Sequence, residues 1–170
     1  WDDLFPRATS GLPALIVDRE AQTVRAKRAD RENDLADFYA KFMSGERDFL
    51  ALAPEARLGF DPFLDFAAHD QSYGPEFLKA QVIGPITFGQ MVMLEDERSA
   101  LGDDPELLEA IALGLGGKAA WEARLIRDLG RTPVIFIDEP GLASFGSAFS
   151  TLTADTVIKT MGSACEVVRA

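Results

Sequence analysis

The chain has 170 residues, 47% of them hydrophobic, and a formal net charge of −11 at pH 7, which suits one globular domain with a sizeable core. The negative charge repels phosphate backbones, so nucleic acid is not an expected partner. No apolar run approaches the ~20 residues of a membrane-spanning helix, no signal-peptide pattern opens the chain, and the single cysteine, Cys165, allows no internal disulfide. These features predict a cytoplasmic protein with no membrane partner.

The first half of the chain predicts a hairpin followed by short elements. In order, the patterns indicate strands at 12–17 and 22–26, a charged loop at 26–34, a helix at 33–45, a strand at 48–52 and a helix after Pro62. The first two strands flank a polar turn, so we expect them to pair as a β-hairpin.

The second half predicts longer elements. In order, the patterns indicate a strand at 77–85, a helix from Ile86, a polar connection at 96–104, the longest helix at 104–130, a strand at 133–138, a loop to about Leu152 and a final helix capped by Thr153. Asp104 and Pro105 are typical of a helix start. Gly114, Gly116 and Gly117 weaken the long helix, so we expect them to allow close packing against a neighbour.

Strands that alternate with helices favour parallel pairing with crossover helices. A complete (β/α)8 barrel usually needs at least ~200 residues, more than this chain has. The sequence therefore predicts a single α/β domain over residues 1–170. Its expected architecture is a partial (β/α)8 TIM-barrel-like fold with an N-terminal β-hairpin, and an open doubly wound sheet is the alternative.

The segment PVIFIDEPG at 133–141 places two acids at the end of an apolar strand that suits burial on both faces. Ligands of parallel α/β folds bind at the C-terminal ends of the strands. Asp138 shares a strand face with Phe136, whereas Glu139 points the other way, so only one of the two acids is expected to face a pocket. Each acid either binds a ligand or caps backbone amides of a nearby loop.

Other candidate site residues lie at the end of the preceding strand. Gly84 would let a ligand approach the backbone, and the helix start near Thr87 would offer free N–H groups to an anion, although a plain strand-to-helix turn explains both. Gln81 would face inward if its strand face lines a barrel. His69 is expected at the surface near a helix end, and Cys165 is expected as a small core residue.

Two stretches together, KAQVIGPITFG at 79–89 and PVIFIDEPGL at 133–142, resemble the cobalamin-independent methionine synthase family. SGLPALIVD at 10–18 and SAFSTLTADTVI at 147–158 look like the small, single-barrel relatives of that family in the uroporphyrinogen decarboxylase-like superfamily. The resemblance implies a TIM barrel that transfers a methyl group from a folate to the thiol of homocysteine, with zinc activating the thiolate. It also implies that Asp138 helps to hold the amino-acid substrate.

The chain departs from the family pattern at two points. Met91 stands where the full-length enzymes carry a pterin-stacking tryptophan, so the resemblance leaves the methyl donor open between a folate and a methylated corrinoid. The family's zinc ligands, a His-x-Cys, a Glu and a further Cys, lie downstream of the Asp-Glu-Pro strand, and the chain stops at Ala170 before them. We therefore expect an incomplete segment of a larger TIM barrel that alone binds no stoichiometric zinc and transfers no methyl group.

The leading hypothesis is a methionine-synthase-like methyltransferase acting on a small-molecule thiol such as homocysteine. Its expected substrate-binding residues are Asp138, Glu139, Gln81, Gly84 and Thr87, and no catalytic residue is assigned. A uroporphyrinogen decarboxylase-like or corrinoid-linked methyltransferase barrel is one alternative, which would need cations such as Arg7 and Lys79 for substrate carboxylates. A non-catalytic small-molecule-binding barrel is another, and the sequence leaves the oligomeric state open.

Overall fold

A computed structural model of the chain describes residues 4–69, 75–147 and 152–170. The α-helices are α1 (Leu4–Thr9), α2 (Arg31–Met43), α3 (Phe60–His69), α4 (Pro85–Met91), α5 (Ala100–Asp103), α6 (Pro105–Asp128) and α7 (Ala154–Arg169). The strands are β1 (Leu15–Asp18), β2 (Thr23–Ala26), β3 (Phe77–Ile83), β4 (Val92–Met93) and β5 (Thr132–Asp138), and short 3-10 helices are η1 (Asp48–Leu50), η2 (Pro54–Ala56) and η3 (Pro140–Ser144).

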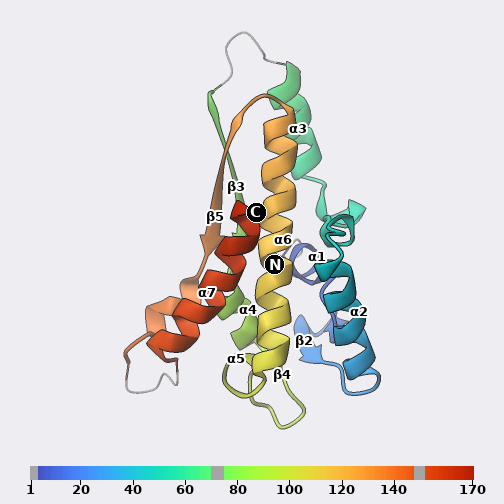
Figure 1. Cartoon of the computed structure of the whole chain (residues 1–170), viewed down its shortest axis with the longest axis vertical. Helices are drawn as coiled ribbons and strands as arrows, with labels where there is room; N and C mark the ends of the chain where they lie inside the picture. The colour runs from blue at the N-terminus through green and yellow to red at the C-terminus, as the bar shows by residue number, and fades with distance from the viewer. Residues whose placement is uncertain (1–3, 70–74, 148–151) are drawn as a thin grey trace.

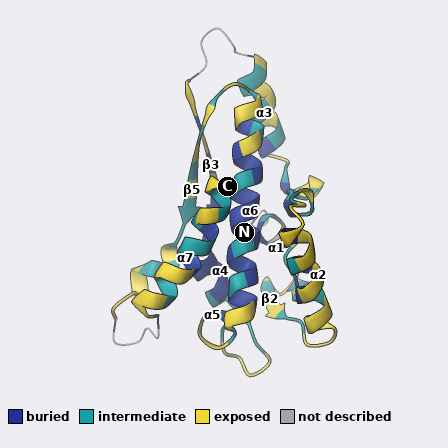
Figure 2. Ribbon diagram, viewed as in Figure 1, coloured by how far each residue is buried: buried dark blue, intermediate teal, exposed yellow. Residues whose placement is uncertain are grey.

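Helix α6 runs along the middle of the molecule, and the other elements pack around it (Figure 1). Its start follows the prediction, because the Asp104 side chain accepts a hydrogen bond from the backbone N–H of Leu107 and Pro105 occupies the first turn. Most of its surface is buried (Figure 2). Two hydrophobic clusters contain α6 residues: one includes Leu35, Phe38, Phe88, Ile111 and Leu115, and the other includes Phe60, Leu78, Ala80, Trp121 and Ile126.

The strands form two small sheets rather than one. The predicted hairpin is confirmed, since β1 pairs antiparallel with β2, and β4 joins β2 in parallel. In the second sheet β3 and β5 run parallel, with Ile83 opposite Asp138. The described residues contain no closed barrel. The observed fold is therefore mixed α/β, with one parallel pair of strands packed against α6.

The glycines of α6 allow close helix contacts, as predicted. A Cβ atom on Gly116 would lie 2.6 Å from the carbonyl oxygen of Ala164 in α7, and one on Gly117 would lie 2.3 Å from a methyl group of Leu50. Both distances are far below ordinary van der Waals contact, so Gly116 has no room for a side chain against the backbone of α7, and a side chain at Gly117 would require Leu50 to shift. The cost of glycine within a helix is offset by this packing.

Several predicted segments differ from the structure. Residues 48–50 of the predicted strand at 48–52 form the 3-10 helix η1, because Leu50 is buried against α6 rather than paired with a strand. The helix expected from Ile86 ends at Met91, where β4 begins, and the polar connection after it contains α5. Helix α2 begins at Arg31, within the segment predicted as a loop, and Arg31 binds the Asp104 carboxylate at 2.7 Å.

The prediction that β5 is buried on both faces is wrong. Val134 is 37% exposed and Phe136 is 48% exposed, whereas Ile135 packs against the hydrophobic cluster on the α6 side. Side chains alternate along a strand, and among the described residues only the α6 side of this two-stranded sheet carries a packed layer. One face of the sheet is therefore open.

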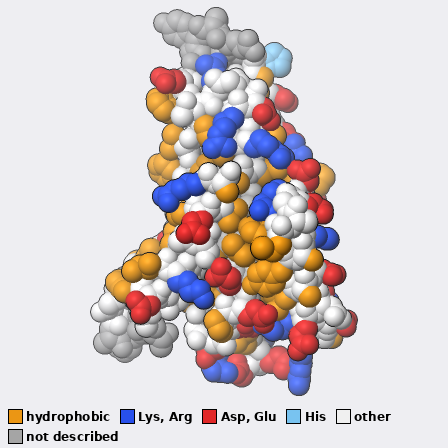
Figure 3. Space-filling model, viewed as in Figure 1, with side chains coloured by type: hydrophobic (Ala, Val, Ile, Leu, Met, Phe, Trp, Pro, Cys, Tyr) orange, Lys and Arg blue, Asp and Glu red, His pale blue; other side chains and the backbone are white. Residues whose placement is uncertain are grey.

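The surface carries charges of both signs. Figure 3 shows acidic and basic side chains interspersed on the face toward the viewer, with hydrophobic side chains exposed between them. Within the ranges that the structure describes, no helix has both the length and the apolar character needed to cross a membrane.

Candidate functional site

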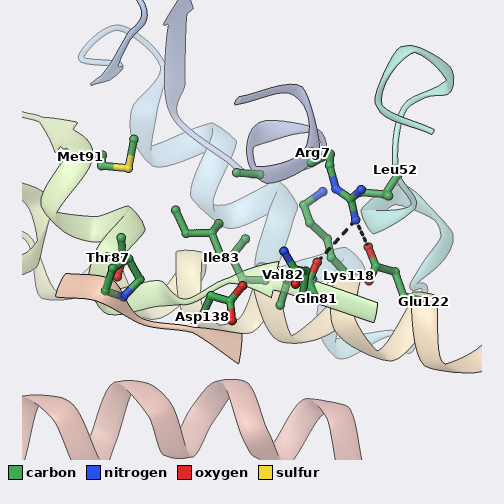
Figure 4. Close-up of a pocket in the computed structure, with 13 residues that line it drawn as sticks. Arg7, Leu52, Gln81, Val82, Ile83, Thr87, Met91, Lys118, Glu122 and Asp138 are labelled. Atoms are coloured by element: carbon green, nitrogen blue, oxygen red, sulfur yellow. Dashed lines mark hydrogen bonds and ion pairs between the residues drawn. The ribbon is translucent and has the colours of Figure 1, made fainter. Parts of the chain in front are cut away.

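A cavity of about 550 Å³ lies beside β3, between α1, α4 and α6, and it extends to the C-terminal ends of β3 and β5 (Figure 4). Its volume is in the range of small-molecule sites. The residues that line it are Arg7, Ala8, Leu52, Gln81, Val82, Ile83, Thr87, Met91, Leu115, Lys118, Glu122, Asp138 and Pro140. Seven of these thirteen residues are apolar, and the other six have polar or charged side chains.

Asp138 is the acid of the pair that reaches the cavity. It lies opposite Ile83 in the parallel register, so the two side chains share the sheet face that points away from α6. The residue is half-buried, and among the described residues its carboxylate has no hydrogen-bond or ion-pair partner. A half-buried carboxylate without a protein partner has its full capacity to accept hydrogen bonds from a ligand.

Glu139 points elsewhere, as the alternation predicts, and both of its carboxylate oxygens are bound within the protein. Its Oε1 accepts a hydrogen bond from the backbone N–H of Ile86 at 2.8 Å, and its Oε2 accepts bonds from the N–H and the hydroxyl of Thr87 at 2.7 and 2.6 Å. Burial raises the pKa of Glu139 above its usual value, opposed by the hydrogen bonds from Thr87 and Ile86. Glu139 does not line the cavity, and it stabilises the start of α4 across the two strands.

Gly84 and Thr87 belong to the same set of contacts. A Cβ atom on Gly84 would lie 2.1 Å from Glu139 Cδ, so glycine is required for the carboxylate to approach. The Thr87 hydroxyl also accepts a hydrogen bond from the N–H of Gly141 at 3.0 Å. We call Gly84, Thr87, Glu139 and Gly141 the strand-end network. The expectation that the helix start offers free N–H groups to an anion is corrected here, because Glu139 occupies the N–H groups of Ile86 and Thr87.

Gln81 lines the cavity from β3, but its amide oxygen accepts a hydrogen bond from Lys79 Nζ at 2.8 Å. The Lys79 ammonium also lies 4.4 Å from the ring centroid of Phe136. Lys79 is therefore bound on the open face of the sheet, and it does not line the cavity. Of the five predicted substrate-binding residues, the cavity brings together Asp138, Gln81 and Thr87.

Lys118 and Glu122 are site residues that the sequence reasoning missed. They lie four residues apart on α6, with 1% and 0% exposure, and they line the cavity with Arg7. Burial lowers the pKa of Lys118 to about 8 and raises that of Glu122 to about 7. The available signal was a Lys–Glu pair at i, i+4 spacing within the most apolar part of a long helix, where charges are rarely placed without a partner.

The chain shows no metal centre in the parts that the structure describes, since nowhere in them do three His, Cys, Asp or Glu side chains gather. His69 lies at the end of α3, where its Nδ1 is 2.7 Å from the carbonyl oxygen of Asp65. Cys165 is half-buried in α7. These two residues lie on different helices, α3 and α7.

A scan against models of protein families, a search of curated proteins and a search of solved structures each found no match to the chain. Its function is therefore inferred from the cavity and the residues that line it.

Proposed function

We propose that the cavity binds a small amino-acid thiol such as homocysteine, as part of a methyltransferase similar to the cobalamin-independent methionine synthases. The observation that supports this proposal best is the carboxylate of Asp138, which has no partner among the described residues and lines the cavity at the C-terminal end of β5. A carboxylate in this position suits a substrate ammonium group, because a charge-assisted hydrogen bond is about twice as strong as a neutral one.

The remaining walls suit the rest of such a substrate. Ile83, Met91 and Leu115 offer apolar surface for a short methylene chain. The strand-end network holds the loop after Asp138 in place, because Glu139 and Gly141 are both bonded to Thr87. A rigid support of this kind keeps a binding carboxylate oriented before the ligand arrives.

In the proposed reaction, the thiol loses its proton and the sulfur forms a bond to the methyl carbon. As that bond forms, the bond between the carbon and the donor breaks and its electron pair stays on the donor, either the nitrogen of a methylated folate, which takes up a proton, or the cobalt of a methylated corrinoid. The described residues do not form a zinc site, so we assign thiol activation to no residue of this chain and derive no step through a metal.

We further propose that β3 and β5 are part of a (β/α)8-like barrel. Parallel sheets occur almost only where both faces are covered, yet Val134 and Phe136 are exposed on the open face. Among the described residues, β5 has a strand partner only on its β3 side. Further strands added beside β5 would extend the sheet toward a closed barrel, with this face on its inside.

Calorimetric titration of the 170-residue chain with L-homocysteine tests the binding part of the proposal. Asp138→Asn should weaken binding by roughly tenfold to a hundredfold, since a hydrogen bond to a charged group contributes about 1.5–3 kcal/mol. Asp128→Asn, at an exposed position of α6 outside the cavity, is the matched control and should bind like the parent. Equal affinities of the Asp138 variant and the parent would refute the role of Asp138.

Methyl transfer is measured separately, as methionine formed from homocysteine with a methylated folate or methylcobalamin. It requires a protein that includes the additional barrel strands proposed above. Homocysteine binding without methionine formation in such a protein would favour the alternative of a non-catalytic binding barrel.

A further inference from the structure

The end of the cavity away from Asp138 contains three charged side chains (Figure 4). Arg7 of α1 donates a hydrogen bond to Glu122 Oε1 at 2.8 Å, and Lys118 lies one helical turn before Glu122 on α6. Two cations therefore accompany one carboxylate. Whether Glu122 is charged or protonated, the two cations leave a surplus positive charge at this end, which is costly where water has little access.

The bonds already formed show which of these groups can still bind a ligand. The Lys118 ammonium donates to the carbonyl oxygen and hydroxyl of Ser10 and to the carbonyl oxygen of Leu50, so its three protons are used. Within the described part of the chain, Arg7 donates through a single terminal nitrogen, toward Glu122 and toward the Gln81 carbonyl oxygen at 3.5 Å. Its side chain is 30% exposed, and a guanidinium has five N–H donors. Arg7 therefore keeps donors for a ligand.

Glu122 provides a second, independent sign of a ligand. Its Oε2 is buried and has no hydrogen-bond partner among the described residues, although buried polar atoms are nearly always bonded. Burial raises the pKa of Glu122 to about 7, so the carboxyl group is often protonated near neutral pH. Since Oε1 accepts from Arg7, that proton belongs on Oε2. The protonated group is a donor that lacks an acceptor.

We propose that Arg7 and Glu122 bind the carboxylate of the same amino-acid thiol whose ammonium group Asp138 binds, and this inference rests on the proposed function. A ligand carboxylate balances the surplus charge, accepts from the free N–H groups of Arg7 and accepts from Glu122 Oε2. Arginine suits this role because its planar fork matches a carboxylate. Lys79, the other cation considered from the sequence, is bound to Gln81 and Phe136 outside the cavity.

The spacing of the two ends suits a small zwitterion. Asp138 lies opposite Ile83, and Arg7 contacts the carbonyl oxygen of Gln81, two residues earlier on β3. Two residues of a parallel strand span about 7 Å. A small amino acid held by one charge-assisted hydrogen bond of about 2.8 Å at each end can bridge this separation.

The test compares three thiols by calorimetry on the 170-residue chain: L-homocysteine, 3-aminopropane-1-thiol, which lacks the carboxylate, and 4-sulfanylbutanoate, which lacks the ammonium group. Arg7→Gln should weaken the binding of homocysteine and 4-sulfanylbutanoate at least tenfold and leave the binding of 3-aminopropane-1-thiol unchanged. Asp138→Asn should weaken the binding of homocysteine and 3-aminopropane-1-thiol and leave the binding of 4-sulfanylbutanoate unchanged. Arg57→Gln is the matched control, because Arg57 is also a half-exposed, ion-paired arginine but lies outside the cavity, against Trp121.

The outcomes separate this inference from the proposed function. If 3-aminopropane-1-thiol binds through Asp138 but Arg7→Gln affects all three thiols equally or none, the inference fails and the proposed function stands. If 4-sulfanylbutanoate depends on Arg7 but no thiol depends on Asp138, the carboxylate site stands and the ammonium site fails. Absence of binding by all three thiols contradicts both.

Two further measurements guard against a purely structural effect of Arg7. The first is the double variant Arg7→Gln/Glu122→Gln, which is used if Arg7→Gln alone does not fold. It removes both partners of the ion pair, so neither is left as an unpaired charge.

The second is the protonation of Glu122. The charged groups that face Glu122 are Arg7 from α1 and Lys118 from α6, and the uncharged Gln81 of β3 lines the same cavity. A bound carboxylate should therefore raise the pKa of Glu122 and cause proton uptake near pH 7.

Titrations in buffers of different ionisation enthalpy measure this uptake. We expect it with homocysteine and 4-sulfanylbutanoate in the parent and not in Glu122→Gln. The same uptake with 3-aminopropane-1-thiol, or an unchanged uptake in Glu122→Gln, would place the titrating group elsewhere and overturn the role of Glu122.

Discussion

The strand-end network and the adjacent cavity contain the same kinds of groups in opposite states. In the network both oxygens of Glu139 are bonded, and the Thr87 hydroxyl donates one hydrogen bond and accepts another. In the cavity, Asp138 has no partner among the described residues and Glu122 Oε2 has none either. Asp138 and Glu139 are thus adjacent in the sequence, but only Glu139 is bonded within the described residues. A completed network fixes the backbone, whereas incomplete bonding leaves capacity for a ligand.

The largest expected effect comes from breaking the network at Gly84. In Gly84→Ala, the new Cβ atom would lie 2.1 Å from Glu139 Cδ and would force the carboxylate away from Ile86 and Thr87. Losing several hydrogen bonds to this half-buried carboxylate should cost about 3–5 kcal/mol of unfolding free energy. Urea denaturation measures the loss.

The control for this variant is Gly162→Ala in α7, where an added Cβ meets no atom within 4 Å. Alanine is favoured over glycine in a helix by about 0.5–1 kcal/mol, so this variant should be slightly more stable than the parent. Similar stabilities for the two alanine variants would show that the network does not depend on close approach at Gly84.

The second prediction concerns the charged end of the cavity and its pH dependence. The folded-state pKa of Glu122 is raised from 4.5 to about 7, so the folded protein holds the proton more tightly than the unfolded chain between these values. Stability should therefore fall as pH rises from about 4.5 to about 7, by at most about 3 kcal/mol. Lys118, with its pKa lowered from 10.5 to about 8, acts oppositely, and stability should be regained above pH 8.

Glu122→Gln tests this sign, because it removes the titrating group and keeps the shape of the side chain. The parent should lose unfolding free energy relative to the variant as the pH rises from about 4.5 to about 7. Glu20→Gln, in the exposed turn between β1 and β2, should show no such change. A flat difference curve for Glu122→Gln would mean that the buried carboxyl titrates normally.

The sequence predicted most of the helices and the parallel strands because their signals are local. The Asp104–Pro105 start of α6, the glycines of its packed face and the Thr153 cap of α7 were all found where expected. The 48–52 segment was misassigned because a short apolar run such as residues 49–52 fits a strand and a short helix equally well. Burial of Leu50 against Gly117 turned part of it into a 3-10 helix instead.

The candidate site was only partly predictable, and the reason is the distance between its parts in the sequence. Strand alternation alone predicted that Asp138 and Glu139 point in opposite directions. The partner of Glu139, the backbone of α4, lies more than 50 residues away, and so no local pattern identifies it. Arg7 and Glu122 are 115 residues apart, and only the folded structure shows that they form one charged end of a cavity.

The smallest expected effect sharpens the contrast between the two acids. Asp138→Asn removes a charge that no described group binds, so the unfolding free energy should change by less than about 0.5 kcal/mol. Glu139→Gln, its matched comparison, exchanges one of the bonded carboxylate oxygens of the network for an amide NH₂ group, which faces backbone N–H donors and cannot accept from them. This variant should lose about 1.5–3 kcal/mol. Urea denaturation at pH 7 compares the two. A loss in Asp138→Asn as large as that in Glu139→Gln would show that Asp138 supports the fold, and an unchanged stability identifies it as the acid free to bind a ligand.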